Sequence, residues 1–339
     1  MAHASALVLL GFVDQPIPDE SKVEWHTNKI GGKPSFPESI DDGMLINLIN
    51  DQLICRKCSS MCSLICQIQC SVDESPAFRV IYVFACLQEK CNYFAVTRLM
   101  HESQSSVGNQ ITTHSKHHQI WDTSGWSDDE DNENGEDSNN LFSSSEINRL
   151  ENSKDTNWKC KFLPKSFDNS LNFKPYYINV ENIDDLKSSK LYLTKKELKY
   201  CQDEPLTNED GEKYENPELS TIFGNDKIAY KFYKKLRDFP KQVIRYSWQG
   251  QPLLNRSNLN YAIEACENCG SSRKFEFQLM PALISKLNFP PSPSSQSSVD
   301  LNYGTVLIYT CSNNCDSKAL SEEKCIFLEE VDENVINKK

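Results

Sequence analysis

Cysteine is the residue type that best equips this chain for chemistry, with fourteen copies in 339 residues. A CxxC pair occurs in each half of the sequence. A further Cys pair, with three or four residues between its members, follows each of them at about the length of a hairpin. Four thiolates on tight turns can surround one tetrahedral Zn²⁺ at about 2.3 Å per bond. The spacing therefore predicts two structural zinc sites, whose ligands would be Cys55, Cys58, Cys86 and Cys91 in the first half and Cys266, Cys269, Cys311 and Cys315 in the second.

The competing interpretation is that these thiols are reduced and buried, because Cys is among the most buried residue types. Repeated CxxC pairs at this spacing favour metal binding over burial alone. Gly270, directly after the second CxxC pair, suits the left-handed backbone of a zinc-binding turn. The remaining cysteines lack a partner at such spacing and are expected to be structural or surface residues: Cys62, Cys66, Cys70, Cys160, Cys201 and Cys325.

The predicted zinc sites are not expected to be catalytic, since four thiolates leave no coordination position open for a substrate or water. The sequence contains no Walker loop, dinucleotide fingerprint, nucleophile elbow or HExxH motif. The His114-x2-His117-His118 group could bind a metal, but its polar surroundings favour a solvated loop. The chain is therefore predicted not to be an enzyme, and a hydrolase with an unrecognised site is kept as a third alternative.

The elements that must position the thiols are mainly strands. Apolar, strand-like segments occur at residues 6–13, 64–70 and 80–86, and in the second of these apolar residues alternate with mostly polar ones. That alternation predicts a strand with one buried face. A helix is predicted from Asp226, because apolar residues recur there at helical spacing and Pro240 follows. Residues 173–180 are expected to be extended and residues 195–200 helical.

The two Cys-bearing halves resemble each other in the order of their features: a Gly-containing turn, a CxxC pair, a strand, a second strand and a second Cys pair. Such an ordered recurrence predicts two copies of one supersecondary unit. The expected fold class is α+β, with two related β-sheet-bearing halves packed into one body and zinc-binding hairpins. Aligning the CxxC pairs without gaps matches Leu64 with Phe275, Cys66 with Phe277, Gln67 with Gln278 and Ile68 with Leu279.

Three parts are predicted along the chain: an N-terminal half over 1–100, a linker over 101–225 and a C-terminal half over 226–339. The linker is expected to be acidic and largely disordered or irregular. Its residues 127–138 carry seven carboxylates and no basic residue, a density of like charge that opposes ordering. A solvated linker is the favoured interpretation, and an acidic tether that screens a basic client is the alternative.

The net charge of −12 disfavours direct nucleic-acid binding and favours basic protein partners. The N-terminal apolar run has no basic segment before it and no small-residue cleavage site after it, so a signal peptide is not expected. No segment reaches the roughly 20 apolar residues that a membrane span requires. We expect a soluble protein of the reducing compartments, where these cysteines are better explained by metal or burial than by disulfides.

Several longer motifs accompany the Cys pairs. In the first half they are Leu10-Gly11-Phe12-Val13-Asp14, the stretch 28–34 and Tyr82-Val83-Phe84-Ala85-Cys86. In the second half they are the stretches 232–246, 266–270, 275–281 and 308–311. Together, over residues 7–100 and 226–332, they resemble the programmed cell death protein 2-like family. The family's parent protein carries a MYND-type finger between the halves, whereas residues 101–225 hold only Cys160 and Cys201, so the chain resembles the paralogue lacking that finger.

This resemblance implies a non-catalytic adaptor or chaperone in biogenesis of the small (40S) ribosomal subunit, shuttling between nucleus and cytoplasm. The implied partners are a basic small-subunit ribosomal protein, pre-40S particles and a nuclear export receptor, with no membrane. An export signal could lie at Ile183, Leu186, Leu191 and Leu193, although an ordinary helix face is the favoured interpretation. The alternative function is a zinc-dependent signalling or transcription scaffold linked to cell death and proliferation.

Overall fold

The computed structural model describes residues 7–70, 77–89, 91–102, 160–164, 172–187, 226–257, 259–288, 301–315 and 319–330. All of these residues belong to one compact unit. Within them, no helix combines the length and apolar character needed to cross a membrane.

Strands account for most of the regular structure in the N-terminal segment. They are β1 (Leu9–Pro16), β2 (Lys29–Ile30), β3 (Ser35–Pro37), β4 (Ser63–Gln69), β5 (Ala77–Ala85) and β6 (Phe94–Glu102). A 3-10 turn η1 (Glu20–Lys22) follows β1. Helix α1 (Asp42–Leu48) runs directly into a π-helical turn η2 (Ile49–Leu53) before β4.

The later segments add further strands and the longest described helix. The strands are β7 (Cys160–Phe162), β8 (Tyr176–Asn182), β9 (Gln242–Tyr246), β10 (Arg273–Leu279), β11 (Thr305–Cys311) and β12 (Leu320–Leu328). Helix α5 (Lys227–Asp238) precedes β9, and a 3-10 helix η4 (Pro281–Lys286) follows β10. Both β7 and β8 come from the interval 101–225. The acidic residues 127–138, the predicted helix 195–200, and Leu191 and Leu193 lie outside the described residues.

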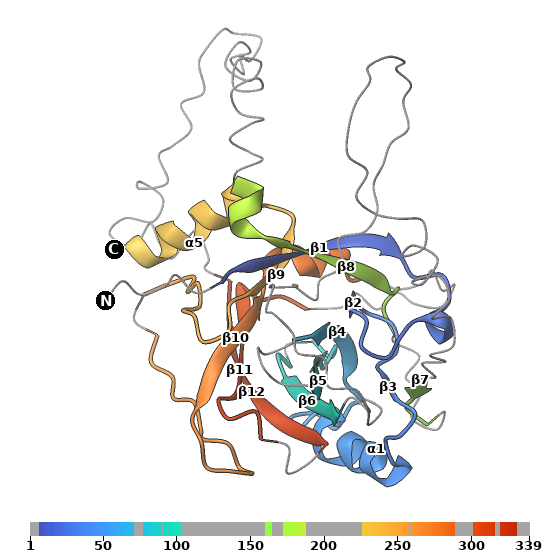
Figure 1. Cartoon of the computed structure of the whole chain (residues 1–339). Coiled ribbons are helices and arrows are strands. Elements are labelled where there is room, and N and C mark those ends of the chain that lie inside the picture. The colour runs from blue at the N-terminus through green and yellow to red at the C-terminus, as the bar shows by residue number, and fades with distance from the viewer. Residues whose placement is uncertain are drawn as a thin grey trace, which may run out of the picture. The chain divides into compact units, whose positions relative to one another are not determined.

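The strands, except for β3 and β7, close into one antiparallel barrel in the order β1-β8-β2-β4-β5-β6-β12-β11-β10-β9 (Figure 1). The remaining pair, β3 and β7, forms a separate two-stranded sheet. Strand β6 pairs with β12 from Leu99↔Leu320 to Val96↔Glu323, so the N-terminal and C-terminal segments share one continuous sheet. The described fold is therefore mostly β with few helices.

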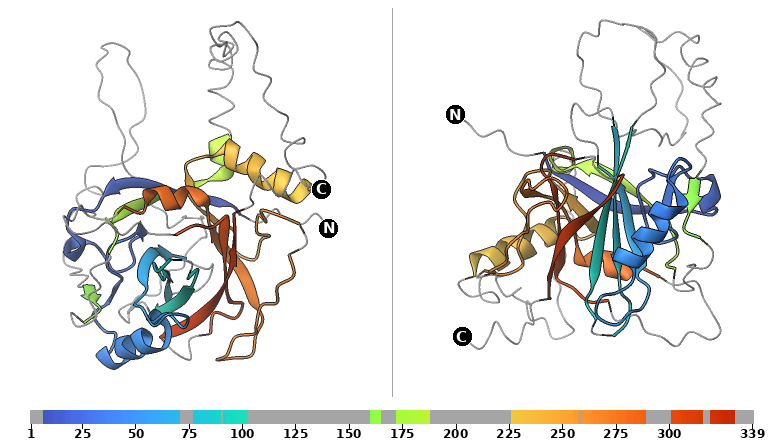
Figure 2. Two further views of the ribbon diagram at one scale, coloured as in Figure 1. Left: turned by 180° about the vertical axis from the view of Figure 1, so that it is seen from behind. Right: turned by 90° about the horizontal axis from the view of Figure 1, so that it is seen from below.

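Strands β1 and β8 exchange places between the two segments. β1 pairs with β9, and β8 pairs with β2, while β1 and β8 also pair with each other. The first strand of the chain thus borders the C-terminal strands, and the strand that precedes α5 borders the N-terminal ones. Figure 2 shows this junction from two further directions, with β1 in blue beside β8 in yellow-green. The exchange makes the barrel depend on both segments at once.

Two hydrophobic clusters cover the two faces of the N-terminal strands. The larger cluster takes residues from strands all around the barrel, among them Ile81, Ile178, Val243 and Phe277, and therefore fills the interior. The second hydrophobic cluster packs α1, η2 and β3 onto the outer face of β4–β6, and it includes Leu45, Leu53, Phe36, Tyr82 and Leu99. This part of the sheet is therefore buried on both faces.

The prediction that β4 exposes one face is wrong. Six of its seven residues are buried, because the interior cluster covers one face and the other lies under residues that include Trp25 and Phe36. Gln67 illustrates the cause: its Nε2 donates to the carbonyl of Trp25 at 2.8 Å, and its Oε1 accepts from the backbone N–H of Ser35 at 3.1 Å. A polar residue in an alternating pattern is here satisfied by neighbouring backbone instead of by water.

The helix predicted from Asp226 is confirmed as α5. The carboxylate of Asp226 caps its N-terminus, accepting from the N–H groups of Ile228 and Ala229, both at 3.0 Å. Ala229 and Phe232 form its buried face. The extended segment predicted at 173–180 is β8 in its greater part, and Ile183 and Leu186 after it pack with Leu10 and Phe239.

Candidate metal centres

The four predicted ligands of the first half converge. Cys55 and Cys58 lie between η2 and β4, and Cys86 and Cys91 follow β5. All four Sγ atoms lie within 4.8 Å of one another. The Sγ–Sγ distance is 3.3 Å from Cys55 to Cys91 and 3.4 Å from Cys58 to Cys86. We call this group the first cluster.

The second half forms an equivalent group, the second cluster. Cys266 and Cys269 precede β10, Cys311 ends β11, and Cys315 lies four residues further on. Their Sγ atoms also lie within 4.8 Å of one another. Cys266 and Cys315 are 3.6 Å apart at Sγ, and Cys269 and Cys311 are 3.5 Å apart. The structure therefore brings together all eight predicted residues, in the predicted two sets.

The sulfur spacing fits a tetrahedral metal ion. Zn–S bonds of about 2.3 Å imply sulfur–sulfur edges of about 3.8 Å in a tetrahedron, whereas a disulfide requires about 2.05 Å. The measured distances of 3.3 to 3.6 Å lie close to the tetrahedral edge, and all eight thiols are free. Either cluster could hold a metal ion, and four sulfur donors are the ligand set that zinc accepts in closed structural sites.

The two CxxC turns have the same backbone hydrogen bonds. In the first Cys turn (residues 55–60), the N–H of Cys55 donates to the carbonyl of Ser60, and its carbonyl accepts from the N–H of Ser59, both at 2.8 Å. Ser59 has a positive φ of 61°, where a non-glycine residue is strained. In the second Cys turn (residues 266–271) the corresponding residues are Cys266, Ser271 and Gly270, again at 2.8 Å, and the φ of Gly270 is 73°, as predicted.

The thiols within each cluster differ in acidity. Hydrogen bonds from the side chain and then the backbone of Ser60 lower the pKa of Cys58 to about 6, and Ser271 lowers the pKa of Cys269 to about 6 in the same way. Burial has the opposite effect elsewhere, raising the pKa of Cys86 to about 11. Each cluster thus contains one exposed thiol of lowered pKa. Binding of a metal would also have to displace protons from the buried thiols of the cluster.

A cation accompanies each cluster. At the first cluster, the backbone N–H of Lys57 lies 3.4 Å from the Sγ of Cys55, and its Nζ donates to the carbonyl of Cys91 at 2.8 Å. At the second cluster, the Nη2 of Arg98 donates to the carbonyl of Cys315 at 2.9 Å and lies 3.7 Å from its Sγ. Such cations can offset the negative charge that four thiolates place around one divalent ion.

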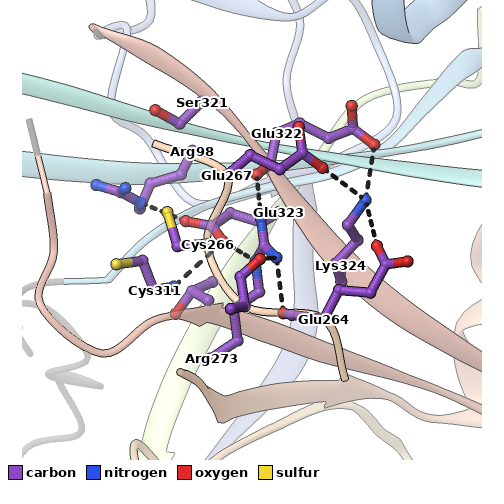
Figure 3. A network of polar contacts seen from close by, with 12 residues as sticks. Arg98, Glu264, Cys266, Glu267, Arg273, Cys311, Ser321, Glu322, Glu323 and Lys324 are labelled. Carbon is purple, nitrogen blue, oxygen red and sulfur yellow. Dashed lines mark hydrogen bonds and ion pairs between the residues drawn. The ribbon is translucent and has the colours of Figure 1, made fainter. Parts of the chain in front are cut away.

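A buried network of two arginines and one glutamate supports the second cluster (Figure 3). The carboxylate of Glu323 accepts from the Nε of Arg98 at 2.7 Å and from the Nε of Arg273 at 2.9 Å. It also accepts from the N–H of Cys311 at 3.1 Å. Because Arg98 belongs to β6, the N-terminal segment contributes directly to the surroundings of the C-terminal cluster.

This network of Arg98, Arg273 and Glu323 was not predicted from the sequence. The available signal was a charged residue inside a strand of otherwise apolar and small residues, since Arg98 follows Ala95, Val96 and Thr97. A buried charge in such a strand needs a partner, but the sequence does not show which of its many carboxylates provides it.

The remaining described cysteines do not join either cluster. Cys66 and Cys70 are buried in the barrel interior and Cys62 in the second hydrophobic cluster. Burial raises the pKa of all three. The Sγ of Cys160 donates to the carbonyl of Val23 at 2.6 Å, and Cys325 is partly buried. Cys201 and the histidines at 114, 117 and 118 lie outside the described residues.

Comparison with known proteins identifies the relatives of this chain. The family model for the N-terminal domain of programmed cell death protein 2 matches residues 7–118, and the model for its C-terminal domain matches residues 226–333. The human programmed cell death protein 2-like (Homo sapiens) is 27% identical over 372 residues, covering 98% of this chain and 99% of the relative. The mouse protein of the same name (Mus musculus) is 28% identical, with the same coverage.

A chicken programmed cell death protein 2-like (Gallus gallus) is 38% identical over 140 residues, which cover 40% of this chain and 35% of the relative. No solved structure matches the chain. The N-terminal and C-terminal family models match the first and the second Cys-bearing segment of this barrel, respectively. The human and mouse relatives are matched over nearly their whole length. The chain therefore belongs to the programmed cell death protein 2-like family.

Proposed function

We propose that this protein is a non-catalytic adaptor or chaperone in biogenesis of the small ribosomal subunit, and that it binds a basic ribosomal protein. The observation that carries the proposal is the composition of the two clusters. Each has four sulfur donors within 4.8 Å, so a bound ion would be fully coordinated and would have a structural role. On this proposal each cluster holds one Zn²⁺, and the ions fix the two Cys turns for binding instead of activating a substrate.

A basic client is supported by the charge of the chain. A net charge of −12 attracts basic proteins and speeds their association, while it repels a phosphate backbone. Ribosomal proteins are basic and expose apolar segments before assembly, so a chaperone for them needs both an acidic and an apolar surface. The proposed locations are the cytoplasm and the nucleus, with shuttling between them as part of pre-40S particles and in contact with an export receptor.

We also propose that the two Cys-bearing segments are copies of one unit. Several details at aligned positions support this. A β-bulge interrupts the β4–β5 pairing between Leu64 and Cys66, and another interrupts the β10–β11 pairing between Phe275 and Phe277. The Oε1 of Gln278 accepts from the backbone N–H of Leu253 at 2.8 Å, just as Gln67 accepts from Ser35. The two donors also occupy equivalent positions, because Ser35 directly follows Pro34 of the first Gly-containing turn and Leu253 directly follows Pro252 of the second.

Affinity purification of the tagged full-length chain tests the functional proposal. A chaperone should recover one basic ribosomal protein of the small subunit in stoichiometric amount, and binding should weaken as salt is raised. Recovery of signalling or transcription regulators without a ribosomal protein would favour the scaffold alternative. Recovery of neither class, even at low salt, would contradict both.

A further inference from the structure

A cleft of about 710 Å³ lies between the two Cys turns. The first Cys turn contributes Arg56 to its lining, and the second contributes Glu267 and Asn268. These are residues between the cysteines of each CxxC pair, so part of the lining belongs to the turns that carry the two clusters. We call this space the inter-turn cleft.

One part of the lining is apolar. Met44 and Leu48 from α1, together with Ala319 and Leu320 at the start of β12, line the cleft. Met44 is 44% exposed, which makes it one of the few large apolar side chains that are exposed among the described residues. An exposed Met beside other apolar residues is a surface that can adapt to the side chains of a partner.

The remaining lining is polar and includes three carboxylates, those of Asp51, Glu267 and Glu322. Asp51 is exposed, and the side chain of Glu267 is 64% exposed. Arg56 does not neutralise them, because its Nη2 binds the carboxylate of Glu322 at 2.9 Å and the carbonyl of Asp51 at 3.1 Å. Lys324 is shared among Glu264, Glu267 and Glu322 at 3.2, 3.1 and 3.6 Å (Figure 3). The lining therefore holds three carboxylates against one cation, Arg56. Lys324 lies beside it and is shared with Glu264, so an excess of negative charge remains.

We propose that the inter-turn cleft is the docking site for a basic, partly apolar peptide segment of the client. Lys or Arg side chains of the segment would pair with Asp51 and Glu267, and an apolar side chain would pack against Met44 and Leu320. The excess of carboxylates opposes a nucleic-acid backbone, and the apolar part of the lining gives a peptide contacts that salt does not screen. This inference rests on the proposed function, since it names where the basic client would bind.

The test uses full-length, metal-loaded protein and fluorescence anisotropy with labelled peptides of about twelve residues, long enough to fill a groove. The first peptide alternates Lys or Arg with Leu, the second replaces each Leu by Ser, and the third replaces each basic residue by Glu. We expect the first to bind most tightly, the second more weakly and with a steeper salt dependence, and the third not to bind.

Variants assign the binding to the cleft. Asp51→Asn with Glu267→Gln should weaken binding of the first peptide about threefold to tenfold, as expected for two exposed charge pairs. Met44→Ser should weaken it about tenfold, by removing an apolar contact without changing the charge of the cleft. The matched controls are Glu329→Gln with Glu330→Gln, two exposed carboxylates, and Ile46→Ser, an exposed apolar residue of α1, none of which lines the cleft. Zinc content and melting temperature should match the wild type in every variant.

The outcomes separate the docking site from the proposed function. If the cleft variants bind the first peptide as the wild type does, or if the control variants lose as much affinity, the docking site is wrong. If the wild type recovers a ribosomal protein from cells and the cleft variants recover it equally well, the docking site is again wrong while the proposed function stands. If no ribosomal protein is recovered but the peptide still requires Asp51, Glu267 and Met44, the proposed function fails and the docking site stands.

Discussion

Arg79 of β5 and Glu276 of β10 form a two-point ion pair, although 197 residues separate them along the chain. The distances are 2.6 Å from Nη1 to Oε1 and 2.5 Å from Nη2 to Oε2, and both residues are buried. Since β5 and β10 are not neighbours in the barrel, this pair connects the N-terminal and C-terminal segments independently of strand pairing.

Replacing Arg79 by Met should lower the free energy of unfolding by about 3–5 kcal/mol, because the carboxylate of Glu276 would remain buried without its partner. Urea denaturation of metal-loaded protein measures this loss. The control is Lys187→Met, which removes the exposed pair with Asp184 and should cost less than about 1 kcal/mol. A double variant, Arg79→Met with Glu276→Met, should recover part of the loss, and equal losses in the single and double variants would argue against a coupled pair.

Substitutions at the equivalent positions 270 and 59 of the two Cys turns should have opposite effects on stability. Gly270→Ala should destabilise the chain by about 1 kcal/mol, because an L-residue is strained at its φ of 73°. Steric contact adds nothing there, since no atom lies within 4 Å of the added Cβ. Ser59→Gly should stabilise the first turn by about 0.5–1 kcal/mol, because it relieves the strain at a φ of 61°. Thermal melts of both variants measure the two changes in stability. If both variants were stabilised, or both destabilised, the two Cys turns would not share the same backbone geometry.

Arg98→Met should weaken the second cluster more than the first. The substitution removes the hydrogen bond to the carbonyl of Cys315 and one of the two arginines that hold Glu323. We expect the metal content to fall from about two ions per chain toward one. Lys57→Met is the matched change at the first cluster and should leave the second occupied. Loss of both ions in either variant would mean that these cations stabilise the whole fold instead of their own cluster.

Removal of metal should expose particular thiols to alkylation. Cys58 and Cys269 are the exposed members of their clusters, whereas Cys66 and Cys70 are buried in the barrel interior. After mild treatment with a chelator, iodoacetamide should therefore modify Cys58 and Cys269 first, as mass spectrometry of peptides would show. Metal-loaded protein should be protected at both positions. Equal labelling with and without chelator would contradict metal binding by these thiols.

The features that the sequence predicts well are local ones. The grouping of eight cysteines into two clusters follows from CxxC spacing. The cap at Asp226 follows from residue type, and the alignment of Gln67 with Gln278 places two residues that make equivalent hydrogen bonds. Each of these depends on a few neighbouring positions, where residue type and backbone geometry are closely linked.

The features that the sequence does not predict are long-range ones. The exchange of β1 and β8, the pairing of β6 with β12 and the partners of Arg79 and Arg98 all join residues far apart in the chain. Burial of both faces of β4 has the same origin, because the residues that cover its outer face, among them Trp25 and Phe36, lie outside β4. A hydrophobic pattern shows that a strand has an apolar face, but which element covers the other face depends on tertiary packing.

The proposed function requires that both four-cysteine clusters hold structural zinc on which the fold depends, and elemental analysis of the purified full-length chain measures this directly. Protein prepared without chelator should contain close to two zinc ions per chain, one for each cluster. Cys266→Ser with Cys269→Ser should reduce this to about one or less, with a lower melting temperature. A chain that is fully folded and contains no zinc would show that the fold does not depend on zinc at these clusters.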